Sequence, residues 1–86
     1  MKKPLPTTAK ETFSQNVGLM RRVKNLSQEK LAEMANLHRT YVGQIERGDV
    51  TPTLEAAERV AQALGLELWE VLQPGLSLDA VLNQSK

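Results

Sequence analysis

Apolar residues recur at the three- and four-residue spacing of an amphipathic helix along most of the chain. The first such segment places four apolar residues on one face, namely Phe13, Val17, Met20 and Val23. This spacing predicts a helix over about residues 8–24. Thr7 or Thr8 can cap its start, and Glu11 stands three residues after Thr8, as in a capping box. No alternation typical of a strand competes, so the pattern predicts an all-α protein.

Shorter segments with the same periodicity follow, each bounded by residues that begin or end helices. We expect helices over residues 28–35, 39–47, 54–64 and 68–72, and a last turn or short helix over 78–83. Ser27 and Thr53 cap two of them at the N-terminus, because their hydroxyl oxygens can accept a first-turn N–H. Asn36 and Gly48 end two others, because both residues tolerate the left-handed backbone conformation. We expect the core to be filled by Leu31, Ala32, Met34, Ala35, Leu37, Val42, Ile45, Leu54, Ala57, Val60, Ala61 and Leu64.

The most informative stretch is residues 28–47, where two helices of eight or nine residues are joined by three residues. Two short helices that cross steeply need a small residue at their contact and a turn former after it, and Ala32 and Asn36 fill these places. Helix-turn-helix motifs use this arrangement to present their second helix to the major groove of DNA. Gly is the usual turn residue, so Asn36 is a mild departure.

Composition narrows the class of protein further. The chain has 86 residues, enough for one core, with 41% hydrophobic and 24% charged residues, as in ordinary soluble domains. It has no cysteine and one histidine, which excludes disulfide staples, thiolate zinc sites and thiol nucleophiles. No apolar run approaches the roughly 20 residues of a membrane span, and Pro4 and Pro6 follow the basic start instead of a signal-peptide core. We therefore expect a cytoplasmic protein with no metal, no cofactor and no membrane contact.

Charge is distributed unevenly, although the net charge is only +1. Residues 1–47 carry nine Lys or Arg against four acids, and residues 48–86 carry two against six. Such asymmetry indicates a half that faces a polyanion, although scatter over solvated helix faces would look similar.

Four runs of residues resemble the Cro/C1-type (XRE-like) helix-turn-helix family. They are Leu26-Ser27-Gln28-Glu29-Lys30-Leu31-Ala32, Leu37-His38-Arg39-Thr40-Tyr41-Val42, Gln44-Ile45-Glu46-Arg47-Gly48 and Pro52-Thr53-Leu54. The chain is similar to restriction–modification controller proteins and to small plasmid or phage repressors over about residues 12–73. The resemblance implies a lambda-repressor-like domain of five helices that binds double-stranded DNA as a two-fold dimer. With the prolines and lysines near the start, we expect a flexible arm (1–7), the DNA-binding domain (8–73) and a C-terminal extension (74–86) that can form part of the dimer interface.

Three residues of the predicted helix 39–47 are candidates for reading DNA bases, because they lie opposite the apolar Val42 and Ile45. Arg39 can chelate guanine, Gln44 can pair with adenine, and the Thr40 methyl can meet a thymine methyl. Gly43 lies on the same outer face, where a larger side chain would clash with DNA or where glycine is merely tolerated. His38 precedes this helix as a weak cap or a phosphate neighbour, not as a metal ligand.

Three further residues are candidates for contacts to the DNA backbone. Gln28 begins a helix, where free N–H groups and the helix dipole favour a phosphate, and the matching family residue contacts the backbone. The resemblance implies a phosphate contact for Arg47, while Tyr41 can bind a phosphate or pack on the helix 54–64. The resemblance also implies an internal ion pair between Arg21 and Glu46.

Apolar residues near the C-terminus exceed what one short helix can bury in a small domain. We expect part of them to form a dimer interface, namely Leu68, Trp69, Leu72 and Leu76. The alternative is a lid that closes the core over the first and fourth helices.

These features together predict a sequence-specific, homodimeric transcriptional regulator, most simply a repressor of a roughly palindromic operator. The alternative is an antitoxin or protein-binding module that uses the apolar C-terminal surface. An enzyme is disfavoured, because the chain lacks a Gly-rich phosphate loop and a nucleophile elbow, and no small-molecule substrate is expected.

Overall fold

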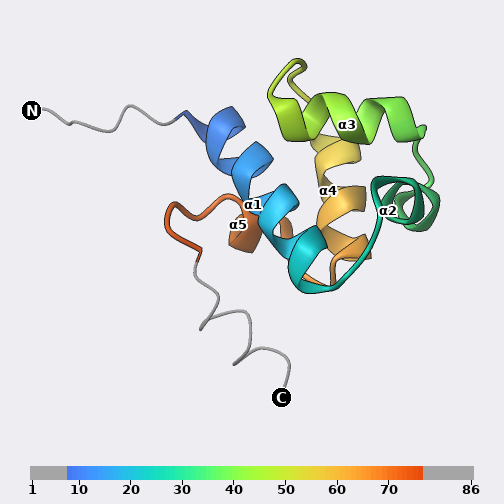
Figure 1. Cartoon of the computed structure of the whole chain (residues 1–86). Coiled ribbons are helices and arrows are strands. Elements are labelled where there is room, and N and C mark those ends of the chain that lie inside the picture. Colours follow the sequence, from blue (N-terminus) through green and yellow to red (C-terminus); the bar gives the residue numbers. More distant parts are fainter. Residues whose placement is uncertain (1–7, 77–86) are drawn as a thin grey trace, which may run out of the picture.

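The computed structural model describes residues 8–76, which form five helices and no strand. The helices are α1 (Ala9–Val23), α2 (Gln28–Ala35), α3 (Arg39–Arg47), α4 (Leu54–Ala63) and α5 (Leu68–Val71). The predicted all-α fold of five helices is confirmed for this part of the chain, while the arm 1–7 and the turn over 78–83 lie outside the described residues. Figure 1 shows α3 along the upper edge of the domain and α5 lower down, beside α1.

The helices begin at the predicted caps. Thr8 and Glu11 form a reciprocal capping box, in which the Glu11 N–H donates to Thr8 Oγ1 (3.1 Å) and the Thr8 N–H donates to Glu11 Oε1 (3.0 Å). Ser27 and Thr53 accept first-turn N–H groups of α2 and α4. His38 caps α3, because its Nδ1 accepts the N–H of Thr40 at 3.2 Å.

Two asparagines adopt the left-handed conformation at the ends of helices. Asn36 has φ 58° after α2, as predicted, and it turns the chain directly into α3. Asn25 also has φ 58°, between α1 and α2, where the sequence indicated only a break. Both short connections thus depend on a residue whose side chain tolerates positive φ.

The core lies where α2 packs on α3 and α4 and where α1 packs on α3 and α5. Its fully buried larger side chains are Met20, Leu31, Ile45, Leu64, Val17, Val42, Val60 and Val71. Leu54 and Met34 were predicted to face inward, and this prediction is wrong. Leu54 is 79% exposed and Met34 is 48% exposed. Leu54 lies on the same face of α4 as buried Ala61, but two turns earlier, where the helix extends beyond the core. Met34 lies at the side of the buried face of α2.

One buried polar side chain fastens α5 to α1. Asn16 Nδ2 donates to the carbonyl oxygens of Val71 (2.7 Å) and Gln73 (3.0 Å). A helix of four residues is not stable on its own, because it is too short to offset the cost of helix nucleation. The Asn16 side chain and the burial of Val71 therefore hold α5 in place. No helix among residues 8–76 is long and apolar enough to cross a membrane.

Candidate nucleic-acid interface

The outer face of α3 is polar and accessible, whereas its inner face anchors the helix in the core. Val42 and Ile45 are fully buried. Arg39 and Thr40 are exposed, and Gln44 is half-buried. The structure therefore places the three candidate base-reading residues away from the apolar face, with Thr40 and Gln44 one helical turn apart.

A polar hollow lies where the start of α2 meets the outer face of α3. It is lined by Gln28, Arg39, Thr40, Gly43 and Arg47. Arg39, Gly43 and Arg47 follow one another at four-residue spacing, so they form a single stripe that faces Gln28. Two guanidinium groups and an amide, with no carboxylate among the lining residues, make a site for an anion such as a phosphate. Gln44 does not line this hollow.

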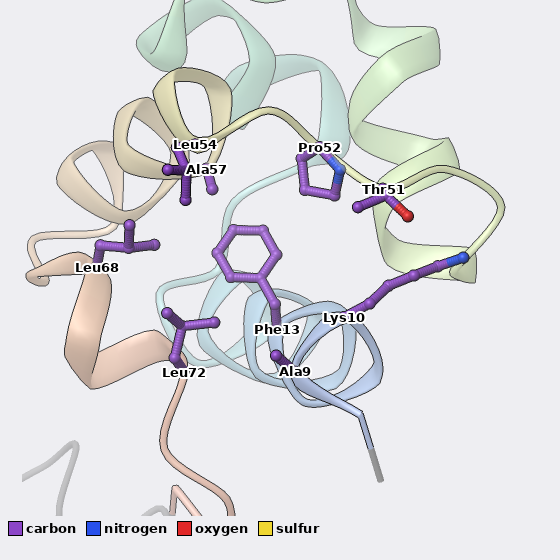
Figure 2. Close-up of a pocket in the computed structure, with 9 residues that line it drawn as sticks. All are labelled: Ala9, Lys10, Phe13, Thr51, Pro52, Leu54, Ala57, Leu68 and Leu72. Atoms are coloured by element: carbon purple, nitrogen blue, oxygen red, sulfur yellow. The ribbon is translucent and has the colours of Figure 1, made fainter.

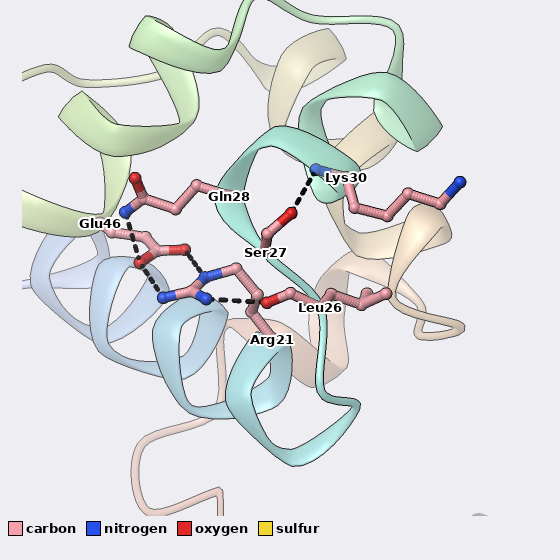
Figure 3. Close-up of polar contacts among 6 residues, drawn as sticks. All are labelled: Arg21, Leu26, Ser27, Gln28, Lys30 and Glu46. Carbon is pink, nitrogen blue, oxygen red and sulfur yellow. Dashed lines mark hydrogen bonds and ion pairs between the residues drawn. The ribbon is translucent and has the colours of Figure 1, made fainter.

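Arg21, Glu46 and Gln28 form a connected set of hydrogen bonds beneath the hollow (Figure 3). Arg21 Nε and Nη2 donate to the two Glu46 carboxylate oxygens at 2.6 and 3.0 Å, and Arg21 Nη1 donates to the Leu26 carbonyl at 2.8 Å. Only 16% of the Arg21 side chain and 9% of the Glu46 side chain are exposed. The pair ties α1 to α3 and to the turn before α2, so it positions both helices that face the hollow.

Glu46 also holds Gln28, a contact that the sequence did not indicate. Gln28 Nε2 donates to Glu46 Oε1 at 3.1 Å, and the amide oxygen lies on the side of Gly43. One carboxylate therefore orients a candidate phosphate-binding side chain as well as the Arg21 guanidinium.

Gly43 lies on the outer face of α3 as expected, where it lines the hollow, but it is buried beneath neighbouring side chains. A Cβ at this position would lie 3.2 Å from Arg47 Nη1 and 3.5 Å from Gln28 Oε1. The absence of a side chain thus lets Arg47 and Gln28 fold over the middle of the helix.

Tyr41 and Arg47 differ in their surroundings. Tyr41 is half-buried and packs against the core, and its contact with DNA stays a prediction. Arg47 is exposed, and its Nε donates to Asp49 Oδ2 at 2.9 Å. The sequence did not indicate Asp49 as a site residue, because it lies in the loop after Gly48, and only its place beside Arg47 in the folded chain marks it.

A second groove is apolar and lies between three parts of the chain (Figure 2). These are the start of α1, the loop that precedes α4, and α5. Its lining residues include Phe13, Leu54, Leu68 and Leu72, with Lys10 at the edge. Of the four residues predicted for a dimer interface, Leu68, Leu72 and Leu76 pack against the edge of the core, as the lid alternative expects. Trp69 is the one that projects outward, with 61% of the residue exposed.

A sequence model of the helix-turn-helix family matches residues 19–68. The chain belongs to the helix-turn-helix family. The control protein C.SmaI of Serratia marcescens is 43% identical over 63 residues, which cover 73% of this chain and 75% of that protein. The immunity repressor of Bacillus phage phi105 is 42% identical over 57 residues, which cover 66% of this chain and 40% of that protein.

The fold of this helix-turn-helix protein agrees with that of a solved relative. The crystal structure of the restriction–modification controller protein C.AhdI from Aeromonas hydrophila superposes with a TM-score of 0.68 at 40% identity. The match covers 70% of this chain and 91% of C.AhdI. The resemblance to controller proteins and phage repressors is thereby confirmed.

Proposed function

We propose that this protein is a sequence-specific DNA-binding transcriptional regulator that acts as a homodimer, with α3 in the major groove. The observation that carries the proposal is the polar outer face of α3, which presents Arg39, Thr40 and Gln44 and borders a hollow lined also by Gln28 and Arg47. Membership of the helix-turn-helix family supports the same conclusion. Such a regulator works where promoter DNA is, so we expect it in the cytoplasm.

The two parts of this surface divide the work of recognition. Arg39, Thr40 and Gln44 read base edges, because bases carry the sequence information. Gln28, Arg47 and Tyr41 bind the sugar–phosphate backbone and set the register of α3 in the groove. Gln28 and Arg47 both line the hollow beside α3, which fits a phosphate at the groove edge.

A second copy of the chain covers the apolar groove and Trp69. Exposed Leu54 lines this groove, and exposed Trp69 directly follows Leu68, another lining residue, in the sequence. Exposed Met34 lies on another surface. A two-fold dimer places two α3 helices about one DNA turn apart and therefore requires a roughly palindromic operator. Where the operator overlaps a promoter, the bound dimer excludes polymerase and represses transcription. A relative from Bacillus phage phi105 is named an immunity repressor, which supports the role of a repressor.

The test is a selection of random duplex DNA by the purified protein at roughly physiological salt, followed by sequencing of the retained duplexes. A two-fold symmetric motif supports a dimeric regulator, and retention without a motif contradicts sequence-specific binding. Arg39→Ala should lose the motif, whereas Arg59→Ala should keep it. Arg59 is a matched control because it carries the same charge on α4 and lines a different surface, with Met34 and Asn36.

The alternative use of the apolar surface is binding to a different protein, as in an antitoxin. Exposed Trp69 and Leu54 favour some apolar contact, whichever partner makes it. Sedimentation of the purified protein discriminates between the two. A dimer at micromolar concentration supports the regulator, and a monomer that also retains no DNA supports the protein-binding module.

A further inference from the structure

Arg47 is held by an acid that lies just beyond the end of its own helix. Its Nε donates to Asp49 Oδ2 at 2.9 Å, and both side chains are more than half exposed. Because Nε donates to the carboxylate, the direction of the Nε–H bond is constrained, and the two Nη groups are left for another acceptor.

The carboxylate reaches this place because the chain reverses tightly after α3. Gly48 adopts φ 76°, and its N–H donates to the Ile45 carbonyl at 3.0 Å. The Asp49 N–H then donates to the Gln44 carbonyl at 2.9 Å, which wraps the backbone of Asp49 onto the last turn of the helix. The short Asp49 side chain is thus held by a fixed backbone and contacts the long, flexible side chain of Arg47.

The other end of the guanidinium lies over Gly43, at the polar hollow. Arg47 Nη1 lies 3.2 Å from the place that a Gly43 Cβ would occupy, and both residues line the hollow with Gln28 and Arg39. The Asp49 contact and the missing Cβ therefore act together, one by fixing Nε and the other by leaving room for Nη1.

Helix stability does not account for an acid at this place. A carboxylate at the C-terminal end of a helix opposes the helix dipole. An exposed ion pair adds little stability, and near DNA the same charge repels the phosphates.

We propose that Asp49 is a positioning residue, which orients the Arg47 guanidinium so that its Nη groups bind a DNA phosphate in the hollow. This inference rests on the proposed function, since it names how one side chain of that surface is prepared for the backbone. Asp49 itself does not touch the DNA.

The test measures binding of Asp49→Ala to the duplex selected by the unaltered protein, over a series of salt concentrations. Loss of orientation should weaken binding about three- to tenfold, as expected for part of a charge-assisted hydrogen bond. The slope of log affinity against log salt should become shallower by up to about one unit, because one phosphate contact is lost. If Asp49 only repelled the DNA, its removal would increase the affinity for the duplex. Tighter binding by Asp49→Ala therefore overturns the proposal.

Glu55→Ala is the matched control, because Glu55 also forms an exposed ion pair with an arginine, Arg59, at 3.3 Å and does not line the hollow. It should leave affinity and salt slope unchanged. If Asp49→Ala lowers the melting temperature, Asp49→Leu replaces it, because leucine keeps nearly the shape of the side chain and offers no acceptor to Arg47 Nε.

A double-mutant cycle separates positioning from a direct role. Arg47→Ala should weaken binding about tenfold, and adding Asp49→Ala to it should weaken binding no further. A further loss in the Arg47→Ala background overturns the proposal. Failure of the unaltered protein to bind any duplex refutes the proposed function, whereas normal binding with an unaffected Asp49→Ala refutes only the role of Asp49.

Discussion

Glu46 is the residue whose removal should disturb this fold most for its size. Its carboxylate accepts three hydrogen bonds, two from Arg21 (2.6 and 3.0 Å) and one from Gln28 (3.1 Å). Glu46→Ala leaves the Arg21 guanidinium without its counter-charge at a place where only 16% of that side chain is exposed. The contacts that join α1, α2 and α3 at this point are lost together.

The expected cost follows from burial. Removing one partner of a buried ion pair costs about 3–5 kcal/mol, because the remaining charge stays desolvated. The Arg21 side chain retains some access to water and a bond to the Leu26 carbonyl, so we expect about 2–4 kcal/mol for Glu46→Ala. For a domain of this size, each 1 kcal/mol lowers the melting temperature by about 4–8 °C, which gives a decrease of about 10–30 °C.

The assay is thermal and urea unfolding followed by circular dichroism. The matched control is Glu55→Ala, which breaks an ion pair whose acid is 77% exposed and which should change stability by less than about 0.5 kcal/mol. The Arg21→Ala and Glu46→Ala effects should sum to more than the effect of the double variant, because each removes the same pair. Equal melting temperatures for Glu46→Ala and Glu55→Ala would refute the reasoning that burial gives this pair its strength.

Three further predictions test the interface, the turn and the apolar surface. Gln44→Ala should weaken binding to the selected operator by about 1–3 kcal/mol and relax the preference at one base pair; an equal loss on every duplex in a competition assay would make Gln44 a backbone contact. Asn36→Ala should lower the unfolding free energy by about 1 kcal/mol relative to Asn36→Gly, because alanine disfavours φ near 58°; identical urea midpoints for the two variants would contradict this. Trp69→Ser should weaken dimerisation by at least about 1 kcal/mol in sedimentation equilibrium, since aromatic residues are frequent interface anchors; an unchanged dimer would move the interface away from α5.

The helices are predictable from the sequence because the signals for a helix are local. The spacing of Phe13 and Val17, the Thr8–Glu11 capping box and the left-handed Asn36 each act within a few residues of the chain. The helix ends differ from expectation by about one residue, since the last turn of a helix depends on what packs against it. The family was also recognisable in the sequence, because the residues that shape a helix-turn-helix lie close together in residues 26–54.

Part of the candidate site is likewise predictable from local sequence patterns, and part of it depends on contacts between distant residues. That Arg39, Thr40 and Gln44 lie opposite Val42 and Ile45 follows from helical periodicity alone. The Arg21–Glu46 pair came from the resemblance to a family, and nothing in the spacing of residues 25 apart would indicate it. That Gln28 completes this pair as a third member depends on how closely α2 approaches α3.

Contacts between distant elements, and the limits of the core, depend on the tertiary structure. Periodicity assigns Leu54 and Met34 to apolar faces, but it does not say where the core ends, and both residues are exposed. Asn16 is a polar residue on a buried face of its helix. The carbonyl groups of Val71 and Gln73 that accept its hydrogen bonds are more than 50 residues away in the sequence. Gly43 is covered only because Gln28 and Arg47 converge over it. Local patterns are set by the backbone geometry of neighbouring residues, whereas these contacts depend on the packing of distant segments, which no short stretch of sequence encodes.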